Sequence, residues 1–240
     1  MPHPTRRPTC RLGGLALVAA ALSACATPRL APAPAANETP GPGVGAADLT
    51  AGVRVEARAQ AWNGNPANLR TEVTPMLVTI TNGSAVPLRI RYNEMQLAAA
   101  DGRRFAAIPP FDLRGAVTQP VTTPAYPYTG FTVAPYLSPY YPGITPVAPV
   151  AGVGPWGADP LFYDTYYNTI RVKQLPTADM VQRALPEGVL APGGSAGGFV
   201  YFQPVGDDTE RTRFRMSLVN ALTGAQYGFV DIPFVVREGA

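Results

Sequence analysis

The chain has very little histidine, cysteine and lysine, and these shortages exclude the commonest catalytic sites. Its 240 residues include one histidine, His3, two cysteines, Cys10 and Cys25, and one lysine, Lys173. From Cys25 onward there is therefore no histidine, and Cys25 is the only cysteine. This part of the chain cannot build a Ser-His-Asp triad, a Cys-His pair or a zinc site of His and Cys ligands. It also cannot form an internal disulfide, so its stability must come from packing.

The charge balance gives no reason to expect a nucleic acid partner. The sequence has 19 basic and 16 acidic residues, but the three arginines Arg6, Arg7 and Arg11 lie in the first 24 residues, which contain no acidic residue. Basic and acidic side chains are therefore equal in number from Cys25 onward. A nucleic-acid-binding domain needs a basic face. Catalysis in such a chain would need carboxylates, tyrosines, Lys173 or a metal held by oxygen ligands, and we expect neither an enzyme nor a cofactor.

The first 24 residues have the pattern of a secretory signal peptide. The arginines precede an apolar run from Leu12 to Leu22, which is shorter than the roughly 20 residues that a membrane-spanning helix needs. The next residues complete the sequence Leu22-Ser23-Ala24-Cys25. This sequence resembles the lipobox of bacterial lipoproteins, in which the cysteine is lipidated, typically with palmitate, and becomes the first residue. The alternative is an ordinary signal peptide with a chance cysteine at its end.

The resemblance implies a membrane attachment through the lipid on Cys25, in the bacterial cell envelope. Ala26 follows the cysteine where an Asp would retain a lipoprotein at the inner membrane, so the resemblance favours the outer membrane of a Gram-negative cell. Residues 26–48 are rich in Pro, Ala and Gly. Such a segment is typical of a semi-extended linker, so we expect residues 25–48 to be a lipidated cysteine and a flexible tether that reaches up to roughly 70 Å.

The rest of the chain, residues 49–240, has the alternating pattern of an all-β domain. Val53 to Trp62 alternates apolar and polar residues, as a half-buried strand does. Phe199 to Gln203 is apolar throughout and predicts a central strand, whereas Pro233 predicts an edge strand. We count about seven strands in two blocks, which is typical of an antiparallel immunoglobulin-like β-sandwich. Two short helices are expected over residues 159–171 and 177–185, the second with Thr177 as its N-cap.

Two segments resemble the secreted immunoglobulin-like domains of bacterial lipoproteins. One is Val78-Thr79-Ile80-Thr81-Asn82-Gly83-Ser84, a strand with a polar turn, and the other is Leu190-Ala191-Pro192-Gly193 followed by Gly198-Phe199-Val200-Tyr201-Phe202. The resemblance covers about residues 50–110 and 185–237, and it implies a fold and a location. It implies no catalytic residues, because these families share no agreed chemistry.

A long insertion, at about residues 109–175, separates the two blocks of strands. Its residues 115–158 contain no charged side chain, and aromatic residues alternate with many prolines. Uncharged aromatic surfaces are typical of interface cores, so we expect the insertion to contact a partner. The alternative is a disordered or self-packed loop that covers a sheet edge. The candidate partner-binding residues are Tyr126, Tyr128, Phe131, Tyr136, Tyr140, Tyr141 and Trp156.

Three other features are better explained by structure than by binding. The glycine-rich run 193–198 lacks the Lys and Ser/Thr of a phosphate loop and predicts a turn into a strand. Asp207, Asp208 and Glu210 form an acidic group that resembles a calcium site only loosely, and a solvated hairpin tip is the better interpretation. The third feature is a basic stripe that Arg54, Arg58, Arg89 and Arg91 would form on one face of a sheet. The better interpretation is an ordinary polar outer face, in which Glu56 and Glu94 compensate the positive charge.

The sequence therefore favours a non-enzymatic, lipid-anchored envelope protein that acts as a binding or structural module toward an envelope protein or a cell-wall component. The alternative is a carboxylate-dependent hydrolase that acts on cell-wall glycans. Two carboxylates that face each other across a cleft would favour the hydrolase. A convex domain without such a cleft would favour binding.

Overall fold

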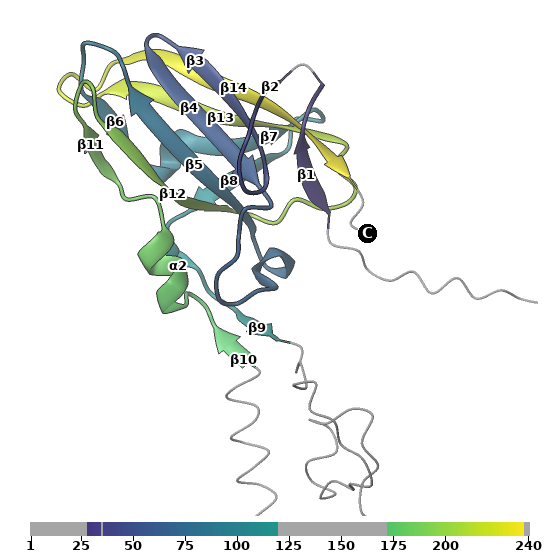
Figure 1. The fold of residues 1–240 in the computed structure, drawn as a ribbon. Coiled ribbons are helices and arrows are strands. Elements are labelled where there is room, and N and C mark those ends of the chain that lie inside the picture. The colour runs from purple at the N-terminus through teal and green to yellow at the C-terminus, as the bar shows by residue number, and fades with distance from the viewer. Residues whose placement is uncertain (1–27, 35, 120–171, 238–240) are drawn as a thin grey trace, which may run out of the picture.

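A computed structural model describes residues 28–34, 36–119 and 172–237 of the chain, and the ribbon in Figure 1 shows them as one β-rich body. The N-terminal block contains β1 (Arg29–Pro32), β2 (Asn37–Thr39), β3 (Val44–Thr50), β4 (Val53–Ala59), the 3-10 helix η1 (Leu69–Thr71), β5 (Thr74–Asn82), β6 (Leu88–Ile90), η2 (Tyr92–Glu94), β7 (Met95–Ala99), β8 (Arg104–Ile108), η3 (Pro110–Asp112) and β9 (Ala116–Thr118). The C-terminal block contains β10 (Val172–Gln174), the helix α2 (Ala178–Arg183), β11 (Gly188–Leu190), β12 (Ser195–Phe202), β13 (Arg211–Asn220) and β14 (Gln226–Arg237).

The strands form one nearly closed, barrel-like antiparallel sheet, so the prediction of a seven-strand immunoglobulin-like sandwich is wrong. Ten strands follow one another in the order β1-β14-β13-β7-β8-β12-β5-β4-β3-β2, with β6 and β11 attached beside β13. Strand β8 joins what would otherwise be two sheets. Its first part, Arg104 to Ala106, pairs with β7, and its last two residues pair with Phe202 and Tyr201 of β12.

The N-terminal strands β1, β2 and β3 overturn the expected tether over residues 26–48. Strand β3 pairs with β4 along its whole length, and Leu30 and Ala46 are buried in the core. The turn between β3 and β4 consists of Ala51 and Gly52, which both have positive φ angles, of 49° and 79°. Two positive φ angles make the type I′ turn that suits a two-residue hairpin. The segments 29–32, 37–39 and 44–50 are therefore part of the sheet.

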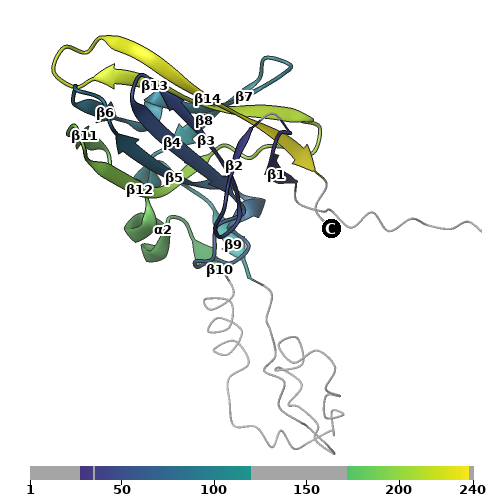
Figure 2. The ribbon, with the colours of Figure 1, turned by 45° about the horizontal axis from the view of Figure 1, so that its top comes forward.

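These added strands bring β3 against β14 and nearly close the sheet. Figure 2 shows the two strands side by side, as Figure 1 does. The Asp48 carboxylate of β3 accepts a hydrogen bond of 3.1 Å from the backbone N–H of Asp231 in β14. Gly228 of β14 lies beside Thr50, and a methyl group on Gly228 would approach the Thr50 side chain to 3.2 Å. The Asp48 side chain thus satisfies the Asp231 N–H at a place where β3 and β14 lie side by side but do not pair as strands.

The interior of the barrel is filled by side chains that alternate inward from the strands. Val55, Ile80, Phe202, Phe214 and Phe234 are among its buried members. Ile80 and Phe234 lie in the core as the alternation predicts. The prediction that Pro233 marks an edge strand is wrong, because β14 lies between β13 and β1.

Truncation of Phe234 tests this core. Phe234 is 1% exposed, so Phe234→Ala should lower the free energy of unfolding by about 3–5 kcal/mol through lost burial and a residual cavity. Phe229 lies on the same strand but is 56% exposed, so Phe229→Ala should change the stability by less than about 0.5 kcal/mol. Urea denaturation of both variants measures the difference. Equal losses in the two variants would show that the inward and outward faces of β14 are assigned wrongly.

Candidate functional site

Strand β12 is buried on both of its faces, and its outer face carries a second hydrophobic cluster. Val200 and Phe202 point into the barrel core, whereas Phe199 and Tyr201 belong to a cluster on the outside of the sheet. The apolar run therefore forms a central strand as predicted, with β5 and β8 on either side. The buried residues of the second cluster are Leu69, Val73, Leu113, Val117, Leu175, Met180, Phe199 and Tyr201.

Helix α2 covers this outer face, and its cap is the one that the sequence predicts. The Thr177 hydroxyl accepts a hydrogen bond of 3.3 Å from the Met180 N–H. Met180 is fully buried, and its carbonyl accepts a hydrogen bond of 2.8 Å from the Tyr201 hydroxyl. Burial, and then nearby charges, raise the pKa of Tyr201, so this phenol stays neutral and serves as a hydrogen-bond donor.

The chain leaving α2 crosses β12 at a glycine. A methyl group on Gly198 would lie 2.5 Å from the Leu185 Cα, which no side chain can tolerate without a backbone shift. The close approach allows Leu185 N–H to donate a hydrogen bond of 2.9 Å to the Phe199 carbonyl. The run 193–198 is thus a turn followed by the start of β12, as predicted, and not a phosphate loop.

The strands β9 and β10, which lie inside the expected insertion on either side of residues 120–171, form a short ladder. Thr118 pairs with Val172, and Ala116 pairs with Gln174, so the chain leaves the described structure and returns to it at neighbouring positions. Val117 of β9 is 1% exposed, because it packs into the second cluster. Figure 1 shows this ladder below α2, at one end of the barrel. We call the ladder, α2 and the 63–68 loop the insertion base.

Hydrogen bonds connect the 63–68 loop to α2 on one side and to the chain around β9 on the other. The Asn65 backbone N–H donates a hydrogen bond of 2.7 Å to the Asp179 carboxylate of α2. The Asn65 carbonyl accepts from the Thr177 hydroxyl at 2.6 Å, and its side-chain oxygen accepts from the Gln119 amide at 2.9 Å. The Asn68 amide donates to the Thr118 carbonyl at 2.9 Å. One loop therefore holds α2 and β9 together.

Trp62 joins these polar contacts to the second cluster. Its ring meets Phe199 edge to face with 4.9 Å between the ring centroids, and its indole N–H donates to the Pro66 carbonyl at 2.8 Å. The Arg183 guanidinium lies 5.9 Å from the Trp62 ring centroid and donates to the Asn63 side chain at 2.7 Å. The base is thus a packed and hydrogen-bonded structure rather than a simple loop junction.

The aromatic residues expected to bind a partner lie outside the described residues. Tyr126, Tyr128, Phe131, Tyr136, Tyr140, Tyr141 and Trp156 all fall within residues 120–171, as does the helix expected over 159–171. Cys25 also lies outside the described residues. What the structure adds is the base itself. Sequence reasoning missed it, because its residues come from distant parts of the chain, although Trp62 at the end of the first alternating segment was a signal for packing.

A groove of about 630 Å³ opens on the outer side of the sheet where β7 and β8 diverge. Arg91, Arg104 and Gln96 are among its polar lining residues, and Glu187 is the one carboxylate that lines it in the described part of the chain. Glu187 accepts a hydrogen bond of 2.8 Å from the Tyr92 N–H. Burial, and to a lesser extent Glu187, raises the pKa of Tyr92 to about 12, so its hydroxyl remains a donor to the Leu185 carbonyl at 2.5 Å.

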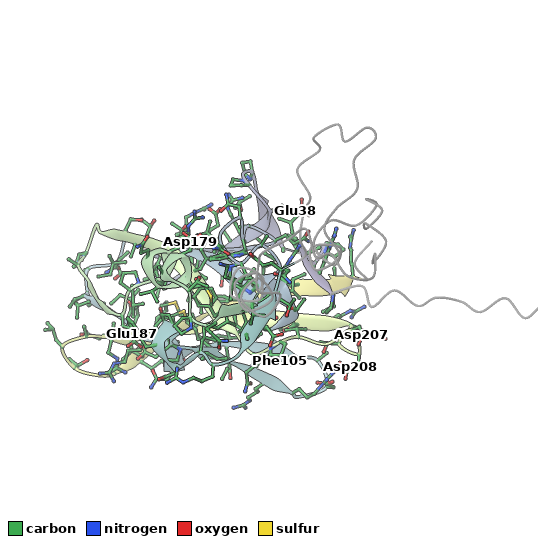
Figure 3. All side chains as sticks on the ribbon, turned by 90° about the horizontal axis from the view of Figure 1, so that it is seen from below. Glu38, Phe105, Asp179, Glu187, Asp207 and Asp208 are labelled. Atoms are coloured by element: carbon green, nitrogen blue, oxygen red, sulfur yellow. The ribbon has the colours of Figure 1, made fainter. Side chains whose placement is uncertain are left out.

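Five acidic residues lie spread around the periphery of the molecule. Figure 3 shows them as Glu38, Asp179, Glu187 and the pair Asp207 and Asp208. Within the described ranges, no group of three or more His, Cys, Asp and Glu side chains lies close enough to hold a metal ion.

Asp207, Asp208 and Glu210 lie in the connection between β12 and β13, which are not paired strands, so the interpretation as a hairpin tip is wrong. Asp208 pairs with an arginine of another connection, Arg103 between β7 and β8. Arg103 bridges Asp208 at 2.6 Å and Asp101 at 2.7 Å. Hydrogen bonds from the backbone and side chain of Arg103 hold the pKa of Asp101 below its usual range. A carboxyl group in that state stays ionised and is a poor general acid.

The arginine stripe is not formed, because its members lie on strands that are not neighbours. Arg54 and Arg58 belong to β4, while Arg89 belongs to β6 and Arg91 follows it. Arg58 pairs with Glu56, and Arg89 pairs with Glu94 at 2.5 Å. The interpretation as polar faces with compensating glutamates is therefore confirmed for these two arginines.

None of the helices in the described part of the chain has the length and apolar character that crossing a membrane requires. Comparisons of the chain with protein-family models, with curated proteins and with solved structures found no match.

The crossing at Gly198 gives a test of the insertion base. Gly198→Ala should lower the free energy of unfolding by about 1–3 kcal/mol and separate α2 from β12, because the methyl group meets backbone atoms of Leu185. Gly197→Ala is the matched control, since its methyl group would meet its nearest atom, the Thr79 hydroxyl, only at 3.4 Å. Urea denaturation measures stability, and Trp fluorescence reports on the packing around Trp62. If both variants behave like the parent chain, α2 does not cross β12 at Gly198.

Proposed function

We propose that the protein is a lipid-anchored protein of the bacterial cell envelope, and that it binds a partner through the insertion between β9 and β10. The observation that carries this proposal is the insertion base. The described segments on either side of residues 120–171 pair in the β9–β10 ladder, and Val117 in the ladder and Leu175 beside it pack in the cluster on the outer face of β12. The second hydrophobic cluster therefore fixes the positions at which the insertion begins and ends.

A fixed base favours binding because it lowers the ordering cost of the segment that it carries. The sequence of that segment supports the same conclusion. Tyrosine and tryptophan give a large contact area at a low cost in conformational entropy, and charged residues are depleted in interface cores. Over residues 115–158 the insertion contains five tyrosines and one tryptophan, and it contains no charged residue. The residues proposed to contact the partner are the seven aromatics from Tyr126 to Trp156 that the sequence singles out.

The envelope location rests on the sequence. Leu22-Ser23-Ala24-Cys25 has the order of residues of a lipobox, and Ala26 after the cysteine favours the outer membrane. The partner would then be an envelope protein or a cell-wall component.

Geometry favours binding over the alternative of a glycan hydrolase. A glycosidase needs two carboxyl groups on either side of its bond, one of them protonated. Among the described residues that line the groove between β7 and β8, Glu187 is the only carboxylate, and it already accepts a hydrogen bond from the Tyr92 N–H. Asp101 and Asp208 do lie near each other, but both are held by Arg103 on an exposed surface.

Replacement of residues 120–171 by a short Gly/Ser linker tests the proposed binding. Since Thr118 and Val172 are paired neighbours, a short linker can join them without strain, and the domain should stay folded. The partners captured by crosslinking in intact envelopes should be lost. A second variant keeps the length of the insertion and replaces its seven candidate aromatics by serine, which separates the effect of contact from that of length. A folded replacement variant that keeps every crosslinked partner would contradict the proposal.

Lipid attachment has a separate test. Cys25→Ala should abolish incorporation of labelled palmitate, because no other cysteine lies after the signal peptide. Cys10→Ala is the control and should leave the incorporation unchanged. Equal labelling of Cys25→Ala and the parent chain would show that the lipobox is not used.

A further inference from the structure

One end of the barrel contains both the entry of the chain into the fold and the insertion base. Strand β1 starts at Arg29 and pairs with the end of β14, with Arg29 opposite Arg237 and Pro32 opposite Phe234. Figures 1 and 2 show that the start of β1 and the β9–β10 ladder lie toward the same end of the barrel.

Contacts between these two regions establish the same arrangement. Pro28 and Arg29 line a small cavity of about 30 Å³ together with Arg70 of η1 and Val73. Val73 in turn belongs to the second cluster, with Val117 of β9 and Leu175. Asn68, just before η1, donates to the Thr118 carbonyl of β9 at 2.9 Å. The short helix η1 thus lies between the start of β1 and the ladder, and it fixes one relative to the other.

The opposite end of the barrel is a full strand length away. Strand β13 starts at Arg211, which pairs with Val235 beside β1, and it ends at Asn220. Its 10 residues span roughly 30 Å at about 3.3 Å per residue. The turn after it, with Leu222 at 83% exposure, therefore marks the far end.

The chain between the lipid-bearing position and the fold is very short. Cys25 precedes Pro28 by three residues, and three residues span at most about 11 Å. A long flexible tether would let the domain take any orientation. A connection of about 11 Å instead keeps Pro28 close to the headgroups of the lipids that hold the anchor.

From this we infer that the end of the barrel formed by Pro28, η1 and the β9–β10 ladder is the face that the protein turns toward the bilayer surface. The inference rests on the proposed lipid attachment at Cys25. The partner of this face is the lipid headgroup region. Because Thr118 and Val172 lie on it, the insertion leaves the barrel next to the membrane and not from the side directed away from it. A protein partner of the insertion would then have to reach the membrane surface.

Site-specific labelling of the lipidated, full-length protein in lipid vesicles tests this orientation. Lipidation blocks Cys25, so a newly introduced cysteine is the only free thiol after the signal peptide is removed. A fluorophore on Gln174→Cys, an exposed position in β10, reports on the inferred membrane face, and one on Leu222→Cys reports on the far end. Nitroxide lipids in the vesicles quench only fluorophores close to the headgroups. The label at position 174 should be quenched several-fold more than the label at position 222.

A lengthened chain supplies the control. About 20 Gly/Ser residues between Cys25 and Pro28 should leave the lipid attachment intact and reduce the quenching at position 174 toward that at position 222. Equal quenching of the two labels in the parent protein would overturn the inference, since the domain would then lie on its side or tumble. Quenching that does not change in the lengthened chain would also overturn it, because the short connection would not set the orientation. Palmitate labelling of each sample shows separately whether the lipid attachment itself has failed.

Discussion

The structure depends on the burial of β12 on both of its faces. A strand in an antiparallel sheet commonly has one face in water, and it then alternates apolar and polar side chains. Phe199, Val200, Tyr201 and Phe202 are all buried. The inward pair completes the barrel core, and the outward pair obliges the chain to supply a second layer. The helix α2, the loop around Asn65 and the β9–β10 ladder are that layer, so the base of the insertion follows from the apolar composition of one strand.

A second constraint is the pairing of the N-terminal residues with the sheet. Strand β3 extends the sheet beyond β4, strand β1 covers β14, and the Asp48 carboxylate satisfies the Asp231 N–H where the two ends of the sheet meet. Closure in this way removes long exposed strand edges, which are prone to associate with other chains. It also shortens the link between Cys25 and the fold to a few residues. The same strands that close the sheet thus bring the domain close to the proposed anchor.

The sequence predicted about seven strands where the described residues form 14, and it did not predict the way they join. Alternation located β4, and the apolar run located β12, because burial on one or both faces leaves a direct trace in the residue pattern. The strands β1 to β3 were missed because their Pro, Ala and Gly residues are typical of a linker, while Ala46 and Ala57 in fact pack closely across β3 and β4. The passage of β8 from β7 to β12 depends on pairing between distant residues, for which a single sequence contains no signal. Thr177 and α2 were predictable because a cap is local.

The candidate site was predictable only in part for the same reason. The uncharged, aromatic insertion is visible in composition, and Cys25 is visible in a local motif. The insertion base is not, because Asn65, Asp179 and Gln119 are far apart in the sequence and meet only in the folded chain. The insertion base is an integral part of the fold and not a loose junction, because its side chains are packed in the second cluster and hydrogen-bonded to one another. Native-state hydrogen exchange of the Leu175 amide, which donates to the Gly115 carbonyl at 3.0 Å next to the β9–β10 ladder, tests that claim most directly. The account predicts that this amide exchanges nearly as slowly as the amides of β12, through the same unfolding event. Exchange at the rate of an exposed loop, independent of the global stability, would contradict it.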